Sequence, residues 1–136
     1  MRAAVPTRHR LTGKTFPRWS RKASLPDSTL CDAVAEMTAG LIDADLDGSV
    51  YKKRVPMPGR GKQDRARIIL GGNLGDRWFF LFGFEKNDRV TIDARELAAL
   101  QKIAAALLAL DTTALDHSVT EGELKEMRNE EDPPAI

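Results

Sequence analysis

Three basic side chains fall at positions where two neighbouring strands would bring them to one surface: Lys52, Arg54 and Arg67. Alternate side chains of a strand share a face, so Lys52 and Arg54 point the same way, opposite to Tyr51. If the apolar faces of the strands meet the helices, the three cations converge on an open face. Such a cluster binds phosphate oxygens, and arginine does so through two parallel hydrogen bonds. Lys53 falls on the apolar face, where its ammonium group must extend to the edge to stay solvated.

The residues directly before this strand suggest another kind of site, because DADLDG begins like a calcium-binding loop. Asp43, Asp45, Asp47 and Gly48 match the first, third, fifth and sixth positions of an EF-hand loop. The twelfth position is Arg54, a cation where calcium needs two carboxylate oxygens, and the segment that follows has the pattern of a strand instead of a helix. The sequence therefore predicts an acidic turn between a helix and a strand.

Other residue types that support chemistry are sparse in this chain. His9 and His117 would form an acid–base pair for RNA cleavage only if the fold brought them together, and nothing in the sequence does so. The single Cys31, with no clustered histidines, argues against a zinc site. Gly59-Arg60-Gly61-Lys62 joins two expected strands and does not lead into a helix, as a phosphate-binding loop requires. We therefore expect no metal and no cofactor.

The composition indicates one compact domain, with 136 residues of which 42% are hydrophobic and 30% charged. A net charge of +1 hides an asymmetry, because the first 22 residues and the middle of the chain are basic, whereas the residues after Leu110 are mainly acidic. Such blocks suggest a basic surface for a polyanion, although random clustering on a solvated surface gives the same pattern. The lone cysteine and the lack of a long apolar run favour the cytoplasm and no membrane contact.

The hydrophobic pattern predicts an α+β fold: an N-terminal helical hairpin, a small antiparallel β-sheet of three or four strands, and a C-terminal helix. The second helix is expected to start with Asp27 as N-cap and to stop at Gly40, with Leu30, Val34, Met37 and Leu41 on its core face. Asp93 and Glu96 form a predicted capping pair for the last long helix. The expected elements are helices near 14–23, 27–40 and 93–111, strands at 50–55, 65–70 and 78–84, and a turn at 71–76. Residues 1–13 would be an irregular basic arm or a weak edge strand, residues 14–128 the domain, and residues 129–136 an acidic disordered tail that follows one more short helix or strand.

A family resemblance rests on an ordered set of segments. The strand Val50–Val55, the loop 59–62, the strand Arg65–Ile69 and the stretch from Phe80 to Asp88, FLFGFEKND, follow one another. Together with TFPRWSRKA before them and DAREL with its leucine-rich helix after them, they resemble the RelE/HigB-like toxins of bacterial type II toxin–antitoxin systems. The resemblance covers roughly residues 14 to 128.

The resemblance implies a metal-independent endoribonuclease, an mRNA interferase that cuts mRNA on the ribosome and is held by a cognate antitoxin. In such a reaction a 2′-hydroxyl attacks the adjacent phosphate, which needs a base, cations for the phosphorane and an acid. A lysine surrounded by other cations serves as a base. By the family pattern Lys52 and Arg54 are the basic pair, Arg67 holds the scissile phosphate, and Lys86 completes the catalytic set. RNA contacts are implied for Arg60, Lys62, Arg65, Asn87 and Phe84, the last by stacking on a base.

Three differences from the family pattern keep an alternative open, and one of them is that the N-terminal arm lacks a clear first strand. Many relatives have tyrosine where this chain has Phe84, and a glycine pair often stands where this chain has Asp64-Arg65. The alternative is a degenerate toxin that binds RNA or the ribosome without cutting. A structural or interaction protein with no role at nucleic acid is a third and more distant possibility.

Overall fold

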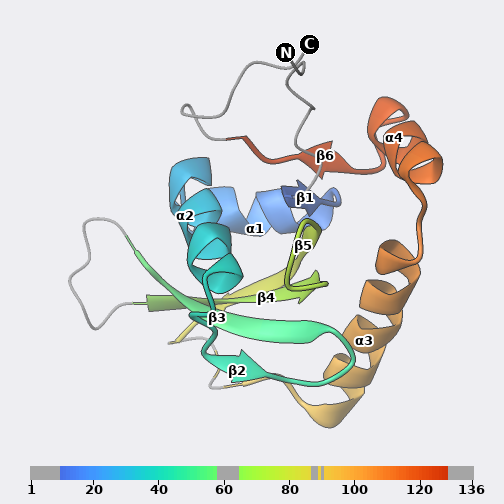
Figure 1. Cartoon of the computed structure of the whole chain (residues 1–136). Helices are drawn as coiled ribbons and strands as arrows, with labels where there is room; N and C mark the ends of the chain where they lie inside the picture. The colour runs from blue at the N-terminus through green and yellow to red at the C-terminus, as the bar shows by residue number, and fades with distance from the viewer. Residues whose placement is uncertain (1–9, 58–64, 87–88, 90, 129–136) are drawn as a thin grey trace.

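The computed structural model describes residues 10–57, 65–86, 89 and 91–128. Within this part of the chain four helices cover a twisted sheet (Figure 1). The helices are α1 (Thr15–Lys22), α2 (Asp27–Thr38), α3 (Ala94–Leu108) and α4 (Thr112–Thr120). The strands are β1 (Arg10–Thr12), β2 (Ala44–Asp45), β3 (Val50–Pro56), β4 (Arg65–Gly72), β5 (Trp78–Glu85) and β6 (Lys125–Glu126).

The α+β class is confirmed, but the sheet has six strands in the order β2-β3-β4-β5-β1-β6 instead of three or four. The three long strands were predicted because each has a sustained apolar pattern, whereas β1, β2 and β6 have two or three residues and leave no such pattern. Gly71 and Gly72, expected in a turn, are the last residues of β4. The apolar strand β5 lies between β4 and β1, as its burial on both faces predicts.

The first strand departs most clearly from the expectation of an arm or a weak edge strand. β1 lies inside the sheet, parallel to β5 and antiparallel to β6. All three of its residues are buried, and Leu11 has no exposed surface. The sheet is therefore mixed, not purely antiparallel. Residues 1–9 and the predicted tail 129–136 lie outside the described residues.

Helices cover both faces of the sheet (Figure 1). On one face α1 and α2 pack on a core that contains Tyr51, Ile68 and Phe80. On the other face α3 packs on Val50 and Ile69, so the face expected to be open is partly covered. What stays accessible on the α3 face is the end of the sheet where β3 finishes and β4 begins.

The helix boundaries follow local chemistry in most places. Asp93 and Glu96 form the predicted capping box, in which each side chain accepts the other's backbone N–H. Gly40 ends α2 with a φ of 99°, and the N–H of Leu41 donates to the carbonyl of Glu36. Two expectations for α2 are wrong: Pro26 is the N-cap in place of Asp27, and Leu41 lies past the helix with 60% exposure.

The predicted last helix, 93–111, is divided in two. α3 ends at Leu108, and Asp111 caps the new helix α4 by accepting the N–H of Ala114. Both α4 and β6 thus occupy the region where one more short element was expected. Within the described residues no single helix is long and apolar enough to cross a membrane, and α3 with α4 meets that length only across a bend of 106°.

Candidate active site

One row of the sheet sets the centre of the basic surface. The register places Arg54 of β3 opposite Arg67 of β4, and Arg67 opposite Phe84 of β5. Directly paired residues project to the same face, so both guanidinium groups lie on the α3 side of the sheet. Arg54 is exposed and Arg67 half-buried. The register therefore places these two arginines on one face of the sheet.

Lys52 lies on the same face, one step further into the sheet. It pairs with Ile69 and with Ala44 of β2, and its side chain is half-buried. A residue outside β3 holds the backbone close to Lys52, because the carboxylate of Asp43 accepts the N–H of Arg54 at 2.7 Å. Lys52 thus belongs to the accessible end of the α3 face, together with Arg54 and Arg67.

Lys86 and Arg65 meet where β4 begins and β5 ends. The N–H of Lys86 donates to the carbonyl of Arg65 at 3.4 Å, and the same carbonyl accepts from Nη1 of Arg67 at 3.4 Å. Both Lys86 and Arg65 are exposed. The structure therefore brings these two residues to the end of the strands that carries Arg54 and Arg67. The remaining predicted RNA contacts, Arg60, Lys62 and Asn87, lie outside the described residues.

Phe84 does not present a free ring face, which corrects the expectation that a base stacks on it. Its side chain is 3% exposed and belongs to the core under α3. The guanidinium carbon of Arg89 lies 5.9 Å from its ring centre and 5.3 Å from that of Phe82. A base would reach Phe84 only after Arg89 had moved aside.

Arg89 is a site residue that the sequence reasoning missed. Its Nη1 lies 2.7 Å from both carboxylate oxygens of Glu96, at the first turn of α3. The hydrogen bonds from Arg89 and from the backbone of Asp93 lower the pKa of Glu96. Two features of the sequence could have indicated this ion pair. Arg89 stands three residues after Lys86, and the capping glutamate Glu96 that follows has a second carboxylate oxygen able to accept a hydrogen bond.

Lys53 occupies the opposite face of β3, as the alternation predicted. It is 7% exposed, and its Nζ lies 2.8 Å from Oε1 of Glu36 on α2 and 3.0 Å from the carbonyl of Leu41. The ammonium group thus extends to the edge of the α2 face, where it forms an ion pair with the Glu36 carboxylate. Lys53 therefore holds α2 on the sheet and does not belong to the basic surface.

The DADLDG stretch forms a β-hairpin between β2 and β3. Its turn contains Asp47, Gly48 and Ser49, all with φ between 62° and 68°. The carboxylate of Asp45 accepts the N–H of Asp47, and Gln101 of α3 donates to the carbonyls of Leu46 and Asp47. The aspartates thus accept backbone N–H groups in and beside a turn that joins β2 to β3, whereas the sequence predicted a connection from a helix to a strand. In the described ranges no group of three or more His, Cys, Asp or Glu residues is arranged to hold a metal ion.

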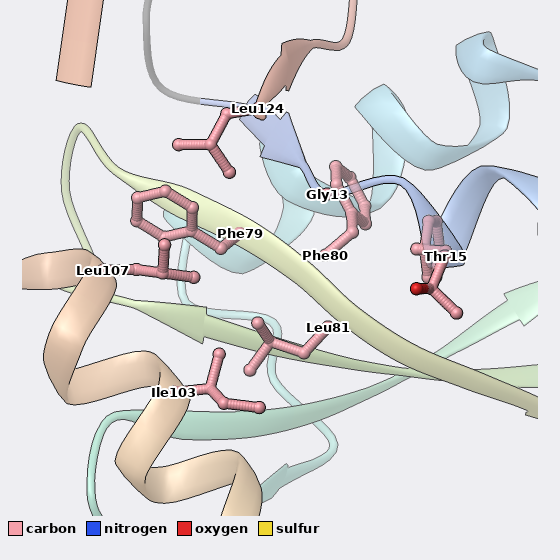
Figure 2. Close-up of a pocket in the computed structure, with 9 residues that line it drawn as sticks. Gly13, Thr15, Phe79, Phe80, Leu81, Ile103, Leu107 and Leu124 are labelled. Atoms are coloured by element: carbon pink, nitrogen blue, oxygen red, sulfur yellow. The ribbon is translucent and has the colours of Figure 1, made fainter. Parts of the chain in front are cut away.

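A separate apolar pocket of about 250 Å³ lies nearer the other end of β5. Figure 2 shows Phe79, Leu81, Ile103 and Leu107 around it, with Leu124 of the segment before β6 above them. Among the lining residues that the structure describes, Thr15 alone has a polar side chain. A pocket of this composition cannot bind a phosphate, so it is not part of the basic site.

A comparison with known protein families shows the family to which this chain belongs. Residues 10–127 match the family described as the RelE toxin of the RelE / RelB toxin–antitoxin system. The match covers most of the chain, and the protein belongs to this toxin family. A cognate antitoxin is therefore implied as its partner. A search of curated proteins finds no match.

Proposed function

We propose that this RelE-family toxin is an endoribonuclease that cuts mRNA on the ribosome. The observation that carries the proposal is the pairing of Arg54 with Arg67 across β3 and β4. Like charges placed directly opposite each other destabilise a sheet, so the fold by itself gains nothing from this pair. A doubly charged ligand such as a phosphorane would offset that repulsion and bind both guanidinium groups.

The proposed reaction uses the cations of the chain in distinct roles. Arg67, near the start of β4, holds the scissile phosphate, and Arg54 neutralises the charge that develops on the phosphorane. A lysine, Lys52 or Lys86, takes the proton from the 2′-hydroxyl as its oxygen attacks phosphorus. The bond to the 5′-oxygen then breaks, that oxygen receives a proton from the other lysine, and a 2′,3′-cyclic phosphate remains.

One observation favours a second candidate, a toxin relative that binds RNA or the ribosome without cutting. Phe84 has no hydroxyl group and is buried, so it can neither donate a proton nor stack on a base in this conformation. Lys52 and Lys86 must then supply both the base and the acid of the reaction. If they do not supply it, the same basic surface still binds phosphates.

A purified translation mixture tests the proposal directly. Wild-type protein is added to ribosomes that carry a defined mRNA, and the ends of the fragments are mapped and analysed for the cyclic phosphate. Replacing single nucleotides at the cut position by their 2′-deoxy forms should prevent cleavage there. Arg67→Ala and Lys86→Ala should each lower the cleavage rate by roughly 10²- to 10³-fold, whereas Lys102→Ala, an exposed lysine on α3, should not.

The same variants give a cellular readout. Induction of the wild-type protein in bacteria should arrest growth, and Arg67→Ala or Lys86→Ala should relieve the arrest. Association with ribosomes without any mRNA fragments would support the non-cutting alternative. No effect on growth and no association with ribosomes would overturn both candidates.

A further inference from the structure

Helix α1 has one apolar side and one basic side. Phe16 stacks on Phe80 of β5 at 5.2 Å between ring centres, and Trp19 packs against Gly83. At about 100° per residue, the basic residues of the helix fall within about 100° of one another on the opposite side. These exposed residues, called here the basic face of α1, are Lys14, Arg18, Arg21 and Lys22.

The basic face of α1 has no counter-charge within the described parts of the chain. None of its four residues makes an ion pair or hydrogen bond with another described side chain, and α1 contains no acidic residue. Arg21 and Lys22 gain some stabilisation from the helix dipole at the C-terminal turn. Lys14–Arg18 and Arg18–Lys22 are like-charge pairs at a spacing of four, which destabilise a helix. The requirements of the fold therefore do not explain the pattern.

The position of α1 connects this face with the candidate active site. Trp19 lies against Gly83, and Gly83 directly precedes Phe84, the residue paired with Arg67. The described part of β1 pairs with β5 only as far as Phe80, so along the rest of β5 that edge has no partner from β1. α1 and the arginine row thus lie on the two faces of the same end of the sheet, and Lys86 directly follows β5 at that end.

We propose that the basic face of α1 binds the sugar–phosphate backbone of RNA outside the position that is cut. This proposal extends the proposed function, because it assigns a second contact surface to the same RNA. Charged side chains on an exposed helix face contact phosphates, and such contacts carry no base identity directly. The face should therefore contribute affinity and salt dependence without contributing sequence preference.

Binding of an uncleavable RNA tests this surface without relying on catalysis. Fluorescence anisotropy is measured with fully 2′-O-methylated RNA, as a trinucleotide and as a strand of about 15 nucleotides, over a range of salt concentrations. The test variant is Arg18→Gln/Lys22→Gln on α1. The control is Arg95→Gln/Lys102→Gln, which removes one arginine and one lysine from the exposed surface of α3. Circular dichroism establishes that both variants are folded.

For the long strand, the α1 variant should lower the slope of log K against log salt by about 1 to 2, because two phosphate contacts are lost. The control should leave this slope unchanged, and neither variant should alter binding of the trinucleotide. Equal losses in both variants, or no loss in the α1 variant, would overturn the proposal. The same holds if the α1 variant binds RNA normally but no longer binds its antitoxin.

Failure of this proposal is separable from failure of the proposed function. If the wild-type protein does not cut mRNA but the α1 variant shows the reduced slope, RNA binding by the basic face of α1 is supported and the ribonuclease activity is refuted. If the wild-type protein cuts mRNA and both double variants bind the long RNA alike, the ribonuclease activity is supported and RNA binding by the basic face of α1 is refuted.

Discussion

Arg89 places Nη1 2.7 Å from both carboxylate oxygens of Glu96 while its guanidinium carbon lies 5.3 Å from the ring centre of Phe82. One side chain thereby links the segment after β5 to the first turn of α3 and covers the aromatic pair Phe82 and Phe84. Glu96 completes the arrangement, because it also accepts the N–H of Asp93 in the capping box. The end of β5 that carries Lys86 is therefore tied to the helix on the α3 face.

Acid should weaken this link in a predictable direction. The pKa of Glu96 is lowered in the folded protein, first by the hydrogen bond from Arg89, so its contribution to stability is present above the unfolded pKa. It is lost as the pH falls through the folded pKa. Thermal unfolding between pH 7 and about pH 3 should show Glu96→Gln less stable than wild type at neutral pH, with the difference vanishing in acid. Glu123→Gln, an exposed glutamate far along the chain, serves as control, and a difference that persisted in acid would contradict the assignment.

The opposed arginines predict that stability and activity change in opposite directions. Arg67→Met keeps an unbranched stem but removes the charge and with it the repulsion from Arg54, so the free energy of unfolding should rise by roughly 0.2–1 kcal/mol. Cleavage should nevertheless be lost. Urea unfolding at low salt measures the gain, and high salt should reduce it. Arg95→Met on the surface of α3 should change neither quantity, and a loss of stability in Arg67→Met would show that the pair is not repulsive.

Gly83 should tolerate no side chain, because α1 rests on it. A Cβ atom there would overlap the ring of Trp19, which is half-buried and packs against the core. Gly83→Ala should therefore lower the free energy of unfolding by about 1–3 kcal/mol and shift the fluorescence of Trp19. At Gly13 a Cβ would meet no atom within 4 Å, so Gly13→Ala is the matched control. Equal stability of the two variants would place Trp19 elsewhere.

Calcium should have no effect on the acidic hairpin. The carboxylates of Asp43 and Asp45 already accept backbone N–H groups, and Arg54 follows where a ligand is needed. Saturation at a hundred times the dissociation constant would stabilise the fold by about 2.7 kcal/mol. We expect the melting temperature to be the same with excess calcium and with a chelator. A rise with calcium would reinstate the metal site.

The sequence was most informative where one residue pattern dominated. Alternation placed Lys53 and Arg54 on opposite faces of β3, and the structure agrees, because Lys53 reaches Glu36 whereas Arg54 joins Arg67. The capping pair Asp93 and Glu96 was equally readable, since both partners lie within four residues. These features depend on residues close together in the sequence or on the two-residue alternation of side chains along one strand.

Features that depend on distant parts of the chain were not readable. The burial of Phe84 requires α3 on the face that was expected to be open, and the position of Arg89 requires the same helix. β1 has three residues and no pattern of its own, so only its partners define it as a strand. The candidate site was therefore predicted as a set of cations beside Phe84, but the burial of Phe84 under α3 was not predicted.

The placement of β1 between β5 and β6 has a consequence for how the chain folds. Leu11 pairs with Glu126, so β1, the first described strand, pairs with β6, the last one in the sequence. Contacts so far apart in sequence close late and slow folding, because the intervening chain must first lose its freedom. During synthesis the sheet lacks β6 until almost the whole domain has left the ribosome. The sheet of this domain is therefore complete only after β6, the last strand of the described residues, has been made.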